Sequence, residues 1–286
     1  MLPELCIALW WLTQYSYAMV IQTIAIVEQS QSGITDSLRT TISHLRAQIG
    51  PFFWLRGLLL FIAYDFAWSA LLPALFPIEA NTWQEHLRSL LLAGLLANIQ
   101  VLWVHVIITK PSAKYIHQRL PGARCWTRVV PAILFDVITN WFLPQYTLEL
   151  ASRLATLTGF MDVQDILNSG GPQALRPGYK LGALSLIPYF IISMATLPAR
   201  TGFIRIAASM LPDNDEPIVP LDPRLKTNPP TGVLDAWRSI PDDTWARAWR
   251  IQARAYILSA SIFFLGKMAY SDFHRFATIP MMWFNS

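Results

Sequence analysis

The sequence predicts an all-α fold: a polytopic transmembrane helix bundle of about six spans, with amphipathic interfacial helices. Of its 286 residues, 53% are hydrophobic and only 14% are charged, whereas a soluble domain has about 25% charged residues. Its 12 tryptophans are typical of chains that place amphipathic rings at both membrane–water interfaces. The expected partner is therefore a lipid bilayer. The net charge of +4 is too small to predict nucleic-acid binding.

Long apolar runs give the positions of the expected spans. A transmembrane helix needs about 20 mostly apolar residues, and the runs that meet this length are 5–27, 52–76, 87–109, 129–151, 181–199 and 249–270. Charged residues interrupt the fourth and sixth runs. Together the runs predict that residues 1–286 form a single transmembrane domain.

The distribution of Lys and Arg predicts the orientation. Sixteen of the 22 basic residues lie in the first, third and fifth connections, and six lie elsewhere. Basic residues are enriched in cytoplasmic loops, which places both termini on the other face and the proline-rich loop at about 211–243 in the cytoplasm. The chain is thus expected to be an integral, multi-pass membrane protein, with the endoplasmic reticulum as the default location.

Two connections have the pattern of surface-lying amphipathic helices. In 37–49 the apolar residues recur at helical spacing, at Leu38, Ile42, Leu45 and Ile49. The segment 199–211 has a similar stripe and runs into an acidic, proline-rich stretch that is expected to be an irregular loop.

Polar residues within the predicted spans indicate a functional pocket, because ionisable groups are expensive there. Asp65 lies near the middle of the second span, and Asp136 lies about two turns inside the fourth. Asn140 shares a helix face with Asp136, and Asn98 shares one with His105. We expect both carboxyl groups to face the bundle interior, because a lipid-facing carboxylate costs about 3 kcal/mol.

Established catalytic motifs are absent from the sequence. It has no G-x-x-x-x-G-K-[ST], H-E-x-x-H or G-x-S-x-G pattern and no D-x-x-x-D motif in or beside a span. The acidic fragments at 213–216 and 242–243 lie in the predicted cytoplasmic loop, where a solvated surface is the simpler interpretation. No metal and no cofactor are expected.

Two stretches resemble polytopic membrane proteins encoded by filamentous fungi. They are VHVIITKPSAK and, more clearly, LPARTGFIRIAASMLPDNDEPIVPLDP. Some such proteins are encoded among secondary-metabolite genes. The resemblance implies source and context, and it implies no activity.

A weaker similarity concerns the small membrane-bound terpene cyclases of fungi. That family uses intramembrane carboxylic acids to protonate an epoxide or alkene among helices rich in Trp and Tyr. Asp65 within YDFAW, and Asp136 with Asn140 and Trp141, are similar in kind. The family usually has seven spans and shorter loops, so the similarity is limited to the types of residue within the spans.

Three functions remain open from the sequence. The first is a cofactor-free, proton-initiated cyclase or isomerase of an apolar, isoprenoid small molecule. Asp65 or Asp136 would donate the proton and Asn140 or His105 would orient it. The expected cavity residues are Tyr64, Trp68, Asn98 and Trp141.

The second function is a proton-coupled transporter, in which the same aspartates form a relay. The third is a non-catalytic membrane scaffold. In a scaffold the polar residues join helices by ordinary hydrogen bonds worth about 1 kcal/mol each.

Overall fold

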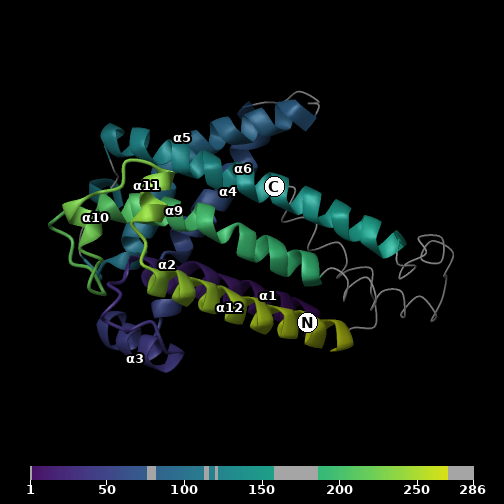
Figure 1. Ribbon diagram of the computed structural model, residues 1–286, viewed down its shortest axis with the longest axis horizontal. Helices are drawn as coiled ribbons and strands as arrows, with labels where there is room; N and C mark the ends of the chain where they lie inside the picture. Colours follow the sequence, from purple (N-terminus) through teal and green to yellow (C-terminus); the bar gives the residue numbers. More distant parts are fainter. Residues whose placement is uncertain (1, 76–81, 113–115, 120–121, 158–185, 270–286) are drawn as a thin grey trace. The chain divides into compact units, whose positions relative to one another are not determined.

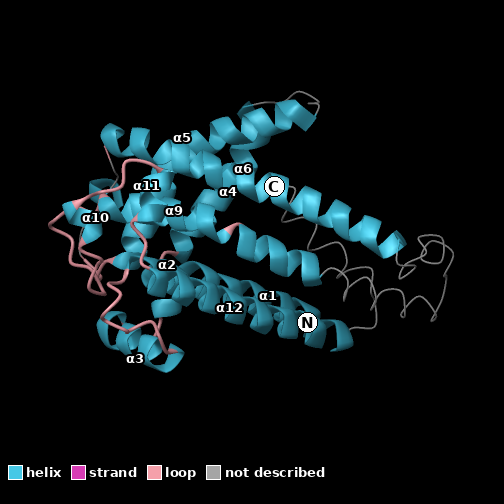
Figure 2. Ribbon diagram, in the orientation of Figure 1, coloured by secondary structure: helices cyan, strands magenta, loops and turns pink. Residues whose placement is uncertain are grey.

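The computed structural model describes residues 2–75, 82–112, 116–119, 122–157 and 186–269. In these ranges the regular structure is helical, with two isolated β-bridges and no strand (Figure 2). The all-α prediction is therefore confirmed.

Two of the described helical segments are long and apolar enough to cross a membrane, judged by length and composition. They are Phe53–Ala74 and Trp83–Ile108, and they correspond to the second and third predicted spans. The described parts of the other predicted spans do not meet this test. The bundle of six spans, the multi-pass topology and the endoplasmic reticulum stay predictions.

The chain divides into two compact units. The first comprises Met1–Gln14, Thr139–Thr196 and Ala253–Ser286, and the second comprises Tyr15–Ile138 and Leu197–Gln252. Residues 158–185 and 270–286 lie outside the described residues. The assignment of the whole chain to one transmembrane domain stays a prediction.

In the first unit, α1 (Leu2–Gln14) lies beside the end of α12 (Asp242–Ala269), as Figure 1 shows. The amide Nε2 of Gln14 donates a hydrogen bond to Oγ of Ser259 over 2.8 Å. A helix at 186–195 is joined to α12 by the Tyr256 hydroxyl, which donates to the carbonyl of Leu186. The predicted span at 181–199 begins outside the described residues.

The second unit contains the larger part of the described chain (Figure 1). Its elements are the π-helix η1 (Tyr15–Ile21), α2 (Gln22–Val27), α3 (Leu38–Ile49), the 3₁₀ turn η2 (Phe53–Leu55), α4 (Leu58–Leu75), α5 (Thr82–Ile108), the 3₁₀ turn η3 (Ile116–Arg119), the first part of α6 (Ala123–Leu157), α9 (Leu197–Ser209), α10 (Arg224–Thr227), α11 (Val233–Arg238) and the start of α12.

The expected spans correspond to helices whose ends differ by several residues. The second predicted span begins at 52, whereas α4 begins at Leu58, because Gly57 has φ +75° and separates it from η2. The first predicted span is helical, but a π-helix interrupts it and every residue of α2 is buried. The end of this segment is therefore packed inside the protein.

One of the two expected amphipathic helices is present, and its position at a membrane interface stays a prediction. Helix α3 has Leu45 fully buried, while Arg39 and Arg46 are exposed. The other expectation is wrong: in α9 all eight residues 201–208 are buried, Arg205 included. Helix α9 contacts α2, α5, α10 and α11, so it is an interior helix. Arg205 is accommodated there because it has polar partners.

The proline-rich segment after α9 closes the ends of α2 and α5. The amide of Asp222 donates to the carbonyl of Val27 over 3.0 Å, and the amide of Ile218 donates to the carbonyl of Ile108 over 2.8 Å. The last carbonyls of a helix lack partners within the helix, and this segment supplies them. The loop expected at 211–243 is thus an ordered structure that includes α10 and α11.

Candidate functional site

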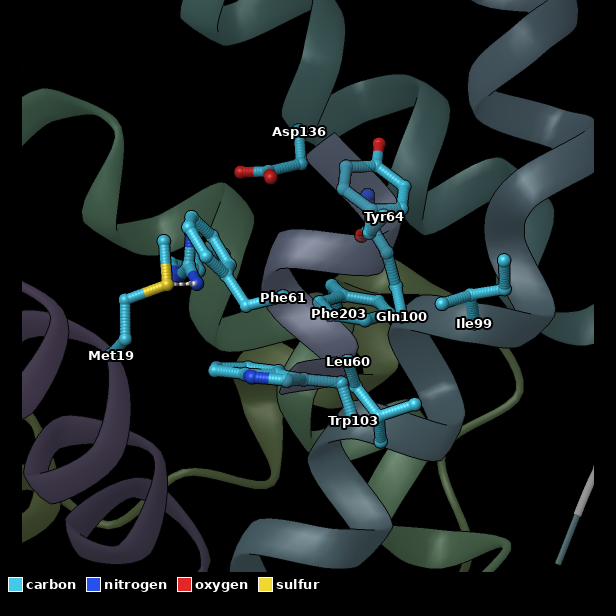
Figure 3. Close-up of a pocket in the computed structure, with 10 residues that line it drawn as sticks. Met19, Leu60, Phe61, Tyr64, Ile99, Gln100, Trp103, Asp136 and Phe203 are labelled. Carbon is cyan, nitrogen blue, oxygen red and sulfur yellow. Dashed lines mark hydrogen bonds between the residues drawn. The ribbon is translucent and has the colours of Figure 1, made fainter. Parts of the chain in front are cut away.

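A cavity lies among η1, α4, α5, α6 and α9 in the second unit. Its volume is about 110 Å³, which is below that of typical small-molecule sites, about 300–1,000 Å³, so it encloses only a part of a drug-sized molecule. Figure 3 shows the residues that line it, which are Met19, Leu60, Phe61, Tyr64, Ile99, Gln100, Trp103, Asp136, Arg200 and Phe203.

Two neighbouring helices contribute most of the wall. Their lining residues share the helical spacing i, i+1 and i+4: Leu60, Phe61 and Tyr64 on α4, and Ile99, Gln100 and Trp103 on α5. This spacing puts three side chains on one face of a helix. The contact between α4 and α5 then brings the two faces to the same space, and the wall is mainly aromatic and aliphatic.

Four polar side chains enter this apolar space. The side chain of Gln100 is hydrogen-bonded to Tyr64. The charges of Asp136 and Arg200 act on Tyr64, and the charge of Asp136 acts on Arg200. A phenol, an amide, a carboxyl group and a guanidinium therefore converge in one cavity. Figure 3 shows Asp136 and Tyr64 on one side of it, with Trp103 and Leu60 on the other.

Arg200 reaches the cavity from the first turn of α9. Its Nη2 donates to the sulfur of Met19 over 3.0 Å, the dashed line in Figure 3. Its Cζ lies 5.8 Å from the centre of the Trp103 ring, which is a cation–π distance. Its Nε is buried and has no hydrogen-bond partner. Burial lowers the pKa of Arg200, and the charges of Asp136 and Tyr64 act in the opposite direction.

Of the two predicted aspartates, Asp136 lines the cavity and is partly buried, as expected. Asp65 is exposed and is not among the lining residues, so the expectation that it faces the interior is wrong. Successive helical residues are about 100° apart around the axis. Since Tyr64 points into the cavity, Asp65 is directed away from it.

The other predicted residues are distributed over several environments. Tyr64 lines the cavity, and the Trp68 ring, which is buried, lies 6.0 Å from the Tyr64 ring. His105 is buried, and its Nε2 is 2.8 Å from the carbonyl of Ala207, so it joins α5 to α9. Asn98 has a buried Oδ1 without a hydrogen-bond partner. Neither Asn98 nor His105 is among the lining residues.

Asn140 and Trp141 follow Asp136 along α6 but belong to the first compact unit. There Asn140 is exposed and Trp141 is partly buried. The structure therefore brings Asp136 and Tyr64 to one cavity, with Trp68 beside Tyr64.

Sequence reasoning missed Arg200 and Gln100. Arg200 is one of the basic residues of the fifth predicted connection, and Gln100 lies in the third predicted span together with Asn98 and His105. The available signal was positional: Arg200 directly follows an apolar run and precedes another apolar segment, 201–208.

Two further arginines lie in the interior, and both are paired. Arg205 donates to Oδ2 of Asp222 over 2.7 Å, to the carbonyl of Ile26 over 3.2 Å and to Oγ of Ser239 over 3.1 Å. Asp222 also accepts a bond from the amide of Arg224. This cluster ties α9 to α2, to the proline-rich segment and to the end of α11.

The second network is centred on Glu28. Its carboxylate accepts hydrogen bonds from Arg247, from both the amide and the hydroxyl of Thr35, and from the amide of Ile34 over 2.6 Å. Arg247 also donates to Oγ1 of Thr35 over 3.0 Å, and its Nε lies 3.3 Å from Oδ1 of Asp36. The network joins the end of α2 to the start of α12.

Within the described ranges, no group of three or more His, Cys, Asp or Glu side chains is placed to hold a metal ion. Burial raises the pKa of Cys125 to about 11, so its thiol is protonated near neutral pH. A protonated thiol is a poor nucleophile.

Comparison of the chain with models of protein families, with curated proteins and with solved structures finds no match.

Proposed function

We propose that this protein is membrane-associated, binds an apolar small molecule in the cavity and moves a proton on it without a cofactor. The convergence of Asp136, Tyr64 and Arg200 in one aromatic-walled cavity carries the proposal. The two apolar helical segments are long and hydrophobic enough to cross a membrane, and this supports membrane association. Both segments also contribute residues to the wall of the cavity. An apolar molecule dissolved in the bilayer would be adjacent to the site.

The direction of proton transfer follows from the charges in the cavity. A guanidinium near a carboxyl group stabilises the carboxylate over the acid. Asp136 therefore suits the role of proton acceptor better than that of donor. This favours isomerisation over proton-initiated cyclisation, which needs a neutral carboxylic acid.

The reaction class is a shift of a double bond next to a carbonyl group. The Asp136 carboxylate takes a proton from the carbon beside the carbonyl, and the electron pair of that C–H bond passes to the carbonyl oxygen. Tyr64 donates a hydrogen bond to this oxygen and steadies its negative charge. Asp136 then returns the proton to another carbon. The step is redox-neutral and requires no co-reactant.

The test is exchange of substrate hydrogen with solvent. The purified full-length chain, in lipid nanodiscs made with D₂O buffer, is incubated with a panel of isoprenoid and fatty carbonyl compounds. Mass spectrometry then measures the deuterium in the recovered compounds. Asp136→Asn should lower exchange by about 10²–10⁴-fold, the usual contribution of a general base. Asp242→Asn, at an exposed carboxyl group, should leave exchange unchanged.

The variant Asp65→Asn tests which of the two aspartates accepts the proton. Exchange that is lost in Asp65→Asn and retained in Asp136→Asn would reject the assignment to the cavity. The absence of exchange from every compound with the unaltered protein would reject the enzymatic proposal and leave the scaffold or transporter.

A further inference from the structure

The guanidinium of Arg200 differs from the other interior guanidinium groups in what it binds. Arg205 and Arg247 each donate to a carboxylate and to further oxygen atoms. The hydrogen bond of Arg200 goes to the thioether of Met19. Its buried Nε has no hydrogen-bond partner, and the Nε of Arg247, which also has none, lies 3.3 Å from Oδ1 of Asp36. A thioether is a weak acceptor, whereas a guanidinium carries five N–H donors. Most of the donor capacity of Arg200 is therefore unused.

We infer that Arg200 binds a carboxylate or phosphate group at one end of the molecule that enters the cavity. The inference rests on the proposed function in taking this cavity as the substrate site. A planar guanidinium matches the geometry of two oxygen atoms of a carboxylate or phosphate, and such paired hydrogen bonds are about twice as strong as neutral ones. Trp103, stacked near the guanidinium, limits its rotation and so favours one binding direction.

The remaining wall specifies the other end of the molecule. Leu60, Phe61, Ile99 and Phe203 line the cavity, and they offer an apolar surface to a hydrocarbon chain or ring. The substrate class is therefore an amphipathic oxyanion: an apolar body with one negatively charged end.

Asp136 sets the strength of this binding. Its negative charge acts on Arg200 and would repel a bound anion in the same cavity. Removal of that charge should thus strengthen anion binding and abolish proton transfer. Because the two effects are opposite, one variant tests the inference and the proposed function separately.

The first test uses the unaltered protein. The full-length chain in nanodiscs is equilibrated with radiolabelled decanoate, and binding to empty nanodiscs is subtracted. Unlabelled decanoate should displace the label at a concentration at least tenfold lower than decanol or methyl decanoate, which lack the negative charge. Acetate and inorganic phosphate should displace it at least tenfold less well than decanoate, because they lack the apolar body.

The second test uses variants of single arginines. Arg200→Gln should raise the Kd for decanoate at least tenfold and leave the Kd for decanol unchanged. Arg200→Lys, which keeps the charge and loses the paired geometry, should fall between. Arg250→Gln removes a positive charge from an exposed position on α12 and should leave the Kd for decanoate as it is. Asp136→Asn should bind decanoate at least as tightly as the unaltered protein.

Several results would overturn the inference. Equal displacement by decanoate and decanol would show that the negative charge is not recognised. Equal displacement by acetate and decanoate would show that the site binds small anions and does not recognise the apolar body. An unchanged Kd in Arg200→Gln would place the anion elsewhere. If decanoate binds as described but Asp136→Asn retains full deuterium exchange, the proposed function fails and this inference stands.

Discussion

The second unit uses interior arginines in two different ways. Arg205 and Arg247 are each surrounded by oxygen acceptors, and each holds together segments that are far apart in the sequence. Arg200 lies five residues before Arg205 on the same helix, yet it faces a cavity and donates to a sulfur atom. The comparison indicates that an arginine hydrogen-bonded to a carboxylate stabilises the fold, and that one whose hydrogen bond goes to a thioether is available to a ligand.

The difference arises from what faces each side of α9. The side of Arg205 meets the proline-rich segment and the end of α11, which supply Asp222 and Ser239. The side of Arg200 meets α4, α5 and η1, whose facing side chains are mainly apolar. One helix thus connects the Asp222 cluster to the candidate site.

The largest expected effect is on the paired arginine. Arg205→Met leaves the buried carboxylate of Asp222 without its cation, and removal of one partner of a buried ion pair costs about 3–5 kcal/mol. Thermal unfolding in a fixed detergent should show a fall in Tm of about 6–20 °C, at about 2–4 °C per kcal/mol. Lys226→Met is the matched control, because it breaks the exposed pair with Asp213. Exposed pairs contribute about 0–1 kcal/mol.

A fall in Tm for Arg205→Met no larger than that for Lys226→Met would show that the Asp222 cluster is not needed for the fold. The contrast between the two kinds of interior arginine would then lose its basis.

An intermediate effect is expected where α9 meets α11. A Cβ on Gly202 would lie 3.1 Å from Nε1 of Trp237 and 3.1 Å from Cγ1 of Val233. That indole donates to the carbonyl of Pro198 over 2.7 Å, so it cannot move without loss of the bond. Gly202→Ala should cost about 1–3 kcal/mol through overpacking, measured by the same unfolding assay.

Gly94→Ala is the control for this change. A Cβ there would meet its nearest atom at 3.9 Å, an ordinary contact, and alanine is favoured over glycine in a helix by about 1 kcal/mol. Gly94→Ala should be neutral or stabilising. Equal Tm values for the two variants would contradict the close packing of α9 on α11.

The helical class and several elements could be predicted from the sequence, because each depends on a pattern within a single segment of the chain. Apolar runs predicted α4 and α5, since both are long and hydrophobic, and the period of 37–49 predicted α3. The burial of α9 was not predictable in this way. Its arginines gave it the pattern of a surface helix. The partners of Arg205, which are Asp222, Ser239 and Ile26, lie 17, 34 and 179 residues away in the sequence.

The candidate site was only partly predictable for a similar reason. A carboxyl group inside an apolar run is visible in the sequence, and this signal led to Asp136. The direction of a side chain around the helix axis depends on which face packs, and periodicity is weak in helices that are apolar all round. Asp65 was therefore misplaced. Arg200 was missed because its approach to Asp136 and Trp103 joins three helices that share no sequence pattern.

The smallest expected effect on stability belongs to Arg200. Arg200→Met removes a partly buried, incompletely hydrogen-bonded cation and leaves an unbranched apolar side chain of similar length. Burial of a polar group without partners is unfavourable, so its removal should offset the loss of the Trp103 contact. We expect a change in Tm of less than about 2 °C, which corresponds to less than about 1 kcal/mol. The same variant should lose oxyanion binding.

The remaining charge of Asp136 is the complication, because Arg200→Met takes away a nearby cation. Comparison with Asp136→Asn and with the double variant measures this coupling directly. A small coupling, with Arg200→Met close to the unaltered Tm and Arg205→Met far below it, would establish that the two arginines have separate roles. A fall in Tm for Arg200→Met as large as that for Arg205→Met would make Arg200 a structural residue. In that case the guanidinium of Arg200 would not be available to bind a ligand in the cavity.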